Sequence, residues 1–561
     1  MPEIIKVRIG NAGAAALLVL MGSAAWPQVT MKPIEGDPVK IDSGRVSGTY
    51  LASGVKAYLG IPFAAPPVRE LRWRAPQPVK PWSGVYTANR IEPECPQNLR
   101  SSDINHYFGE EAVSEDCLYL NIWSPANAKG GAKLPVVVWI YGGGFSGGSS
   151  GMAVYGGEPL AKKGVVYVNF NYRIGVLGFL AHPEATKESG RNASGDWGLL
   201  DQVAALQWVH RNIAQFGGDP ANVMIIGQSA GSMSVCDLQA SPLTEGLIAK
   251  TFGQSGATVT GDQMGLALPA AEQNGLKLQQ ALNAPSLAEM RAASWDKVVT
   301  AARAAGVSAT PIVDGYFLPK SPKAIFDSRE QNDVPTVVGW TTNDIGTNSP
   351  IRSAKTLDEY KAAANAAFGA KTAEFLSLFP AANDAEARSQ AETVGRLSGF
   401  GVQARAWARA QALNGKVPAY LYLFSRAHSY APGVVISGLN PATAGAYHMA
   451  DTPFWLNTID TFNMFRATRA WTPADIDMAG KMSDIVVAFA RTGIPSTPSA
   501  SIVKYNAQDE QMTEFGDAIK LVKLDSKGLD FLANNPVAAP GGRGRGGANG
   551  PAGRGGRGGG N

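Results

Sequence analysis

The stretch at residues 223–231 constrains the fold of this chain more than any other. An apolar run ends there in a Gly-x-Ser-x-Gly pentapeptide centred on Ser229, and a segment that can begin a helix follows. Strand, tight turn and helix in this order are the context of a nucleophile elbow. The turn from strand to helix is so tight that only glycines, which have no side chain, fit on either side of the serine. The serine itself is held in a strained backbone conformation. We therefore interpret Ser229 as a nucleophile; the alternative is a glycine-bounded strand end without chemistry.

The pentapeptide alone is weak evidence, because the chain contains 64 glycines in 561 residues. The same pattern occurs twice more, centred on Ser146 and Ser149. Both of these serines lie in a glycine-rich loop, and no strand leads directly into either of them. The local context therefore favours Ser229 as the reactive serine.

The segments before Ser229 indicate the fold class. Residues 134–141 and 164–170 are almost continuously apolar, which is typical of strands covered on both faces by helices. Apolar residues recur at helical spacing over residues 198–216, and the strand that delivers Ser229 follows. This order predicts an α/β fold with a central, mostly parallel sheet. Further strands are expected at 334–340 and 419–424, and surface or cap helices at 266–305 and 363–409.

Composition and the two ends of the chain suggest its compartment. The formal net charge of +4 gives no indication of a nucleic-acid partner. Residues 1–25 combine two basic residues, a short apolar run and small residues, as in a secretory signal peptide; a disordered or membrane-anchoring end is the alternative. We predict a single domain over residues 26–539, a disordered Gly/Arg tail over residues 540–561, and a periplasmic or secreted protein.

Three cysteines are compatible with an oxidising compartment. Cys95 and Cys117 are close enough in sequence to close a surface loop by a disulfide, and two free thiols are the alternative. Cys236 follows Ser229 by a few residues, and we interpret it as a small, buried apolar residue.

A serine hydroxyl becomes a good nucleophile only when a base takes its proton, and that base is usually a histidine oriented by a carboxylate. In α/β-hydrolases the acid and the histidine follow the serine, which leaves His428 and His448 as candidates. We favour His448 because it lies in a loop context; a structural loop histidine is the alternative. The glycines at 142–144 follow a strand and can bring backbone N–H groups to a substrate as an oxyanion hole, unless they form only a flexible loop.

Together these motifs show that the chain resembles the type B carboxylesterase family, which includes the cholinesterases. The resemblance extends from about residue 46 to residue 530. It implies the α/β-hydrolase fold, hydrolysis of carboxylic esters through an acyl-enzyme without metal or cofactor, a disulfide between Cys95 and Cys117, and oxyanion donors at Gly143, Gly144 and Ala230. The matching segments are residues 58–64, 115–123, 141–145, 171–173, 198–202, 216–220 and 227–231.

Two departures from the family pattern concern the site. The family usually places a glutamate as the triad acid, and here Asp344 falls at that place. The family's His-Gly-x-Glu becomes His448-Met449-Ala450-Asp451, and Met449 and Asp451 are expected to alter the shape of the pocket. Ser255 matches a family serine behind the triad, where it would support the triad.

The predicted function is therefore that of a serine carboxylesterase with a small-molecule ester substrate, without a nucleic-acid partner or a membrane span. A thioesterase or an amidase with the same triad is one alternative, and a non-catalytic binding member of the family is another. The run at residues 169–183 is similar to exported bacterial esterases, among them the fumonisin-type esterases.

Overall fold

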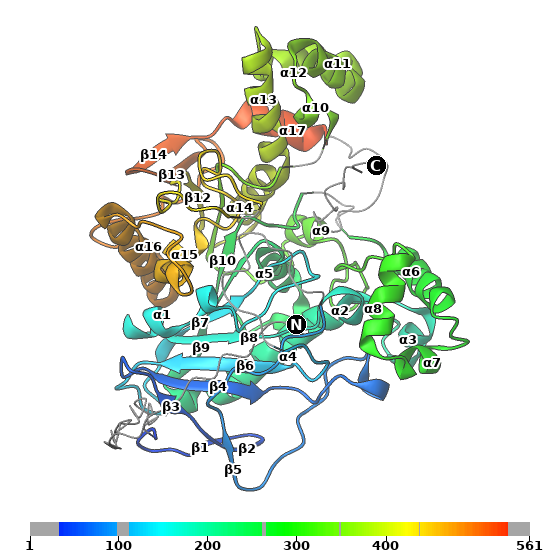
Figure 1. Ribbon diagram of the computed structural model, residues 1–561, viewed down its shortest axis with the longest axis vertical. Helices are drawn as coiled ribbons and strands as arrows, with labels where there is room; N and C mark the ends of the chain where they lie inside the picture. The colour runs from blue at the N-terminus through cyan, green and yellow to red at the C-terminus, as the bar shows by residue number, and fades with distance from the viewer. Residues whose placement is uncertain (1–32, 98–111, 261–264, 347–348, 437, 537–561) are drawn as a thin grey trace, which may run out of the picture.

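The computed structural model describes residues 33–97, 112–260, 265–346, 349–436 and 438–536. The predicted signal peptide at residues 1–25 and the predicted tail at residues 540–561 lie outside these described residues. Within them, an 11-stranded sheet runs through the molecule in the order β14-β13-β12-β11-β10-β9-β7-β8-β6-β4-β3, beside a small three-stranded sheet of β1, β2 and β5 (Figure 1).

The middle of the large sheet is parallel, from β13 across to β8, while the strands at both edges pair antiparallel. This arrangement confirms the predicted α/β class, because the apolar runs in the sequence form buried central strands. The large sheet contains β3 (Thr49–Tyr50), β4 (Lys56–Pro62), β6 (Tyr119–Ser124), β7 (Leu134–Ile140), β8 (Val166–Phe170), β9 (Gly218–Gln228), β10 (Lys250–Gln254), β11 (Thr336–Thr341), β12 (Ala419–Phe424), β13 (Gln511–Phe515) and β14 (Ile519–Lys523). The small sheet contains β1 (Val39–Ile41), β2 (Gly44–Ser47) and β5 (Val85–Thr87).

Helices cover both faces of the large sheet (Figure 1). One face carries α4 (Trp197–Asn212), α5 (Ala230–Ala240) and α14 (Val402–Asn414), which pack on β9, β10, β11 and β12. The other face carries α1 (Glu158–Lys162), α15 (Thr452–Leu456) and α16 (Pro473–Thr492). The helix expected over residues 198–216 is therefore present as α4, extended by the 3-10 turn η4 (Ile213–Phe216).

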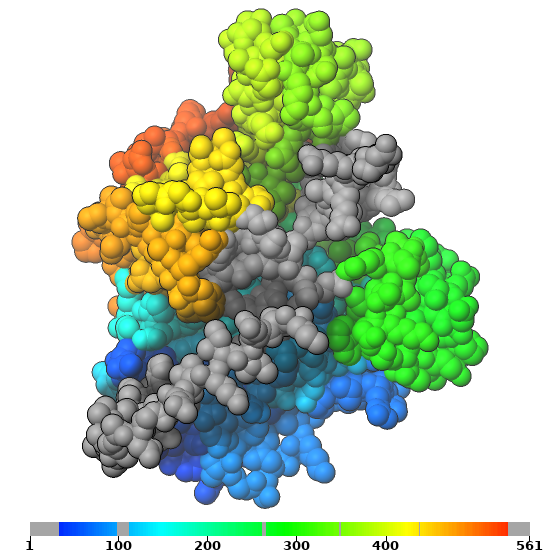
Figure 2. Space-filling model, in the orientation of Figure 1, coloured from blue at the N-terminus to red at the C-terminus, as the bar shows by residue number. Residues whose placement is uncertain are grey.

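Two groups of helices project from this body, as Figure 2 shows in green and yellow-green. They account for the surface or cap helices predicted over residues 266–305 and for most of those predicted over residues 363–409, but residues 402–409 belong to α14, which packs on the sheet. The first group contains α6 (Leu268–Ala281), α7 (Leu287–Ala292) and α8 (Trp295–Ala304), next to α3 (Pro183–Glu188). The second contains α10 (Pro350–Ser353), α11 (Leu357–Phe368), α12 (Thr372–Leu378) and α13 (Asp384–Arg396), with α17 (Ser526–Asn534) beside α12. The remaining helices are α2 (Gly175–Phe179) and α9 (Pro322–Asp327).

The cysteines adopt the arrangement that the resemblance implied. Cys95 and Cys117 form a disulfide with an S–S distance of 2.06 Å. Cys236 lies on α5 and is fully buried among apolar side chains. Burial raises the pKa of its thiol, which is typical of an inert, packed cysteine.

Candidate active site

Ser229 stands between the end of β9 and the start of α5, with φ 58° and ψ −124°. A non-glycine residue with these dihedrals is strained, and the surrounding chain holds it by two backbone hydrogen bonds. Its N–H donates to the carbonyl of Gln254 at 2.8 Å, and its carbonyl accepts from the N–H of Met233 at 2.9 Å. The neighbouring residues on both sides are buried while Ser229 is partly exposed. The elbow geometry predicted for residues 223–231 is thus present.

The two glycines of the pentapeptide are required by close backbone contacts. A Cβ at Gly227 would lie 2.5 Å from the backbone of Gly231, and one at Gly231 would clash with the carbonyl of Ile140. Strand and helix therefore approach too closely for any side chain at these positions. Ser146 and Ser149 have no such surroundings: Ser146 bonds to the carbonyl of Gly143 within its own loop, and Ser149 is fully buried.

The glycine loop after β7 passes directly beside Ser229. A Cβ at Gly142 would lie 2.9 Å from the Cβ of Ser229. Gly143 and Gly144 have φ values of 115° and 62°, which open the backbone toward solvent, and both residues are exposed. Within the described residues, neither of their N–H groups donates to the protein. The N–H of Ala230 begins α5 and has no intrahelical acceptor, so these three N–H groups, one next to Ser229 in sequence and two in the adjacent glycine loop, are left without an acceptor within the described residues.

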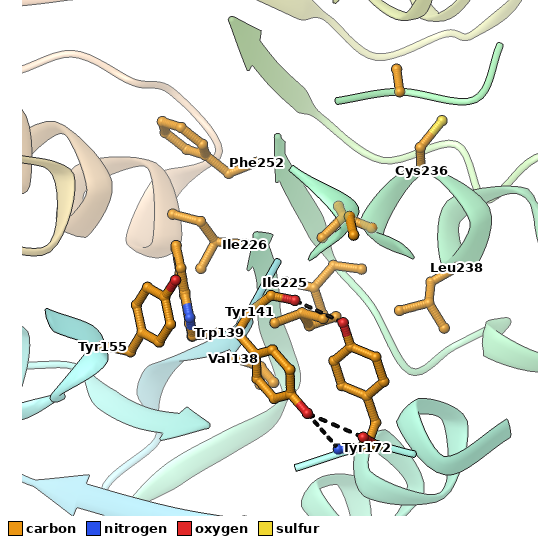
Figure 3. Packing of buried hydrophobic residues seen from close by; sticks show 14 of the residues in the cluster. Val138, Trp139, Tyr141, Tyr155, Tyr172, Ile225, Ile226, Cys236, Leu238 and Phe252 are labelled. Carbon is orange, nitrogen blue, oxygen red and sulfur yellow. Dashed lines mark hydrogen bonds between the residues drawn. The ribbon is translucent and has the colours of Figure 1, made fainter. Parts of the chain in front are cut away.

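The start of this loop is anchored by two stacked tyrosines (Figure 3). The rings of Tyr141 and Tyr172 lie 4.5 Å apart with an interplanar angle of 22°. Each hydroxyl donates to the other residue's carbonyl, at 3.1 Å for Tyr141 and 2.9 Å for Tyr172. Both side chains are fully buried, so the backbone that leads into Gly142 is rigidly placed.

Asp344 lies in the loop after β11, where its side chain is completely buried. Its Oδ2 accepts from the hydroxyl of Ser255 at 2.6 Å and from the N–H of Thr341 at 3.2 Å. Its Oδ1 accepts from the N–H of Ile345 at 2.8 Å. These three hydrogen bonds hold the buried carboxyl group in one orientation. Ser255 follows β10, whose last residue is paired with the last residue of β9 and with Gly339 of β11.

The Nδ1 of His448 lies 2.5 Å from Asp344 Oδ1, although the two residues are 104 positions apart. A parallel bridge between Asn343 and Tyr447 holds the two loops side by side, and the N–H of Asn343 donates to the carbonyl of Ala446 at 2.9 Å. The residue before the serine completes the connection, because Gln228 Nε2 donates to the carbonyl of His448 at 2.9 Å. The acid loop, the histidine loop and the elbow thus form one connected unit.

The other histidine that follows Ser229 has a different environment. His428 is buried, and its ring bonds to the carbonyl of Ala450 at 2.9 Å and to the hydroxyl of Tyr447 at 3.1 Å. Burial, together with the positive charge of Arg469, lowers the pKa of His428 to about 3. A neutral imidazole in this place contacts the side chain of Tyr447 and the backbone of Ala450, on the two sides of His448.

Sequence reasoning missed the aromatic neighbour of His448. The ring of Phe400 stacks on the imidazole with centroids 4.8 Å apart and an interplanar angle of 19°. Phe400 lies in a π-helical segment, Leu397–Gly401, between α13 and α14, where Gly399 has non-helical dihedrals. Single-turn π segments of this kind often occur at functional sites. Only the pair of glycines flanking Phe400 in an otherwise helical pattern could have signalled it.

Asp451 does not shape an open pocket, in contrast to the expectation from sequence. Its side chain is fully buried and accepts from the hydroxyl of Tyr422 at 2.7 Å and from the indole of Trp455 at 3.3 Å. Met449 is also buried, with 5% of its surface exposed. Both side chains therefore lie in the packed interior, Met449 within the hydrophobic core and Asp451 beside Tyr422.

The described part of the chain contains no group of three or more His, Cys, Asp or Glu side chains that could hold a metal ion. Across those same residues, no helix is both long and apolar enough to cross a membrane. The groups gathered at the elbow are a serine, a histidine paired with a carboxylate, and backbone N–H groups of the neighbouring glycine loop.

The order of strands and helices, with the elbow at the carboxyl end of β9, defines an α/β-hydrolase. Comparison with known proteins gives the family. The profile of the carboxylesterase family matches residues 36–531. A fumonisin B1 esterase from Sphingopyxis macrogoltabida is 36% identical over 91% of this chain and 92% of its own length. A cocaine esterase from Homo sapiens is 32% identical over 88% of this chain and 89% of its own.

Solved structures agree with the sequence comparisons. A PNB esterase superposes with a TM-score of 0.73 at 28% identity, covering 88% of this chain and 99% of that one. A thermophilic PNB esterase gives a TM-score of 0.72 at the same identity and coverage. The chain belongs to the carboxylesterase family, and it is a serine carboxylesterase, a hydrolase of carboxylic esters.

Proposed function

We propose that Ser229, His448 and Asp344 are the catalytic triad of this esterase. The observation that supports this assignment is the contact between Asp344 Oδ1 and His448 Nδ1 at 2.5 Å, in a loop unit that Gln228 ties to the elbow. A carboxylate on Nδ1 fixes the tautomer in which Nε2 is free to accept the proton of the serine hydroxyl. Aspartate replaces the usual glutamate without loss of this contact.

In the proposed reaction, His448 takes the proton of Ser229 while the serine oxygen attacks the ester carbonyl. The N–H groups of Gly143, Gly144 and Ala230 hold the oxyanion, at about 3 kcal/mol of transition-state stabilisation for each donor. His448 then gives its proton to the departing alcohol, which leaves an acyl group on Ser229. Water, deprotonated by the same imidazole, attacks the acyl-enzyme and releases the acid.

Active-site labelling tests the assignment of the nucleophile. A fluorophosphonate probe should modify the native protein at one serine, and mass spectrometry of the digest should find the label on the peptide containing Ser229. Ser229→Ala should lose both the label and ester turnover, while Ser146→Ala, in the neighbouring pentapeptide, should keep both. Labelling that persists in Ser229→Ala would overturn the assignment.

The leaving group separates the esterase reaction from its close alternatives. One relative is named a fatty acyl-CoA hydrolase, at 35% identity over 60% of both chains, so a thioester is a relevant comparison. Among matched ester, thioester and amide substrates with one acyl group, the amide should be turned over most slowly, because the triad forms the same acyl-enzyme from each and the amide has the poorest leaving group. An amide rate equal to the ester rate would favour the amidase alternative.

We propose that the substrates include bulky esters of the kind named in the fumonisin B1 esterase relative. What supports this is the identity over 91% of this chain, together with the local similarity at residues 169–183. Release of free acid from fumonisin B1, measured by liquid chromatography with mass spectrometry, tests the proposal. A simple aryl ester of a short acid serves as the positive control, and turnover of the control alone would refute it.

We propose further that the protein is exported, with cleavage of the predicted signal peptide near Ala25. The Cys95–Cys117 disulfide and the fumonisin B1 esterase relative fit a secreted protein. Amino-terminal sequencing of the protein recovered from the periplasm or the medium of an expressing bacterium should begin close to Trp26. Recovery of the uncut chain from the cytoplasm alone would contradict export.

A further inference from the structure

The glycine loop at residues 142–148 is held by a side chain from another part of the chain. The amide of Gln97 bonds to both backbone groups of Gly148: its Oε1 accepts from the N–H at 2.9 Å, and its Nε2 donates to the carbonyl at 2.9 Å. Nε2 also donates to the carbonyl of Cys95 at 3.2 Å. Only 7% of the surface of Gln97 is exposed. This buried amide therefore fixes the last residue of the loop.

The carbonyl groups of the loop set the direction of the N–H groups that follow them, because the C=O and N–H of one trans peptide unit point in opposite directions. The carbonyl of Gly143 accepts from the N–H groups of Ser146 and Gly147, both at 3.1 Å. This carbonyl thus points into the loop. The N–H of Gly144, which belongs to the same peptide unit, must therefore point away from the interior of the loop.

The N–H of Gly143 depends on Gly148 in the same way. A Cβ at Gly148 would lie 2.5 Å from the carbonyl oxygen of Gly142 and 2.6 Å from the ring of Tyr141, so Gly148 lies directly against both. The carbonyl of Gly142 therefore faces Gly148, and the N–H of Gly143 faces the opposite side. Because Gln97 holds both backbone groups of Gly148, it limits where the Gly142 carbonyl can lie and so fixes the direction of this N–H.

The segment that carries the glutamine is itself anchored to the sheet. The disulfide joins Cys95 to Cys117, just before β6. Asn171, just after β8, donates from Nδ2 to the carbonyl of Pro93 at 3.0 Å. Its Oδ1 accepts from both the N–H and the hydroxyl of Ser150, each at 2.9 Å. The segment at residues 93–97 is thus tied to the sheet and to the residues that follow the glycine loop.

We propose that Gln97 is a positioning residue for ester hydrolysis, which keeps the N–H groups of Gly143 and Gly144 directed at the developing oxyanion. This role rests on the oxyanion donors of the proposed function. Such donors lower the barrier only if they are in place before the charge forms. Five of the seven residues at 142–148 are glycines, which supply no side chains to hold the backbone. The amide of Gln97 supplies this restraint from outside the loop.

A transition-state analogue separates this role from simple stabilisation of the fold. An aryl trifluoromethyl ketone forms a hemiketal with a nucleophilic serine, and its oxyanion occupies the donors that the transition state uses. Gln97→Ala should lower kcat for p-nitrophenyl butyrate by about ten-fold or more, and weaken ketone binding by a similar factor, with KM changed by less than about three-fold. Unchanged kcat and ketone affinity in the folded variant would overturn the proposal, as would a loss confined to KM.

Gln97→Met is the second variant, because it fills similar space and removes both hydrogen bonds to Gly148. It should lose kcat and ketone affinity together. Gln411→Ala is the matched control: this buried amide on α14 donates to Asp333 at 2.8 Å and lies outside the glycine loop, so both values should stay near those of the wild type. Rates are expressed per serine labelled by the fluorophosphonate, so a partly folded preparation still gives a kcat. An equal loss in Gln411→Ala would refute a specific role for Gln97.

Ser229→Ala keeps the role of Gln97 distinct from the assignment of the nucleophile. If Ser229→Ala binds the ketone as tightly as the wild type does, the proposed nucleophile is wrong. If the wild type binds the ketone through Ser229 and neither Gln97 variant weakens that binding, the triad assignment stands and the positioning role of Gln97 is refuted.

Discussion

Asp344→Asn removes one charge from the candidate triad and preserves the size of the side chain. The wild-type carboxylate is completely buried and lies 2.5 Å from the imidazole. An ion pair with about 4 Å between charge centres is worth ~4 kcal/mol at an effective dielectric constant near 20, which corresponds to roughly 10³ in rate. The asparagine amide can also donate to Nδ1 and select the wrong tautomer. We therefore expect kcat to fall by about 10³ to 10⁴.

Steady-state hydrolysis of p-nitrophenyl butyrate measures this effect. KM should change little, because Asp344 lies behind the imidazole and does not face the substrate. Asp237→Asn is the matched control: this carboxyl on α5 is also buried, with its pKa raised to about 7 by burial, but it bonds to Thr258 and not to the histidine. Its kcat should stay within a few-fold of the wild type.

The result that would refute this reasoning is a fall in kcat of less than ten-fold in folded Asp344→Asn, with circular dichroism like that of the wild type. Asp344 would then not be the group that orients His448 and stabilises its protonated form during the reaction. Asp344→Glu offers a second check, since the family's usual acid at this position should retain more activity than the asparagine variant.

Four further predictions follow from the same contacts. Phe400→Ala should lower kcat by about five- to ten-fold, the equivalent of a stacked aromatic contact of about 1 kcal/mol, while Phe400→Tyr keeps most of the rate in the same assay. Ser255→Ala removes a hydrogen bond to a charged carboxylate, worth about 1.5–3 kcal/mol, so kcat should fall by roughly ten- to hundred-fold; an unchanged kcat would exclude a supporting role. Burial raises the pKa of Asp451 to about 6 from the ordinary 3.8, so the folded protein holds the proton of this carboxyl group more tightly than the unfolded chain does. The free energy of unfolding should therefore fall as pH rises from about 4 to 6. Asp451→Asn should lack this pH-dependent loss of stability, which is at most about 3 kcal/mol. Thermal melting between pH 4 and pH 7 measures it, and a melting temperature that changes with pH equally in both proteins would contradict the prediction. Cys117→Ser should lower the free energy of unfolding by about 3 kcal/mol, and a melting temperature equal to that of the wild type would argue against a stabilising disulfide.

Several parts of the molecule could be predicted because they depend on short-range physics. The elbow at residues 223–231 is fixed by local steric limits, since Gly227 and Gly231 have no space for a Cβ and residues 223–226 of the strand before them are apolar and buried. The central strands could be located for a similar reason, because continuous apolar runs need cover on both faces. The family resemblance added the order of acid and histidine, which no local pattern contains.

The surroundings of the candidate site were decided by the tertiary structure. His428 and His448 both follow Ser229 in the sequence, yet packing buries one beside Arg469 and brings the other to Asp344. Phe400 reaches the imidazole only because α13 and α14 meet at a π-helical turn. Asp451 turned inward to Tyr422, although the sequence suggested a pocket residue.

The sequence by itself determined the strained serine, the sheet class and the family of this esterase, because those properties arise within a few residues or from ordered motifs. Which side chains lie against the imidazole depended on contacts between segments distant in the chain. Such contacts follow from the packing of whole helices on the sheet, and their geometry is set only when the chain has folded.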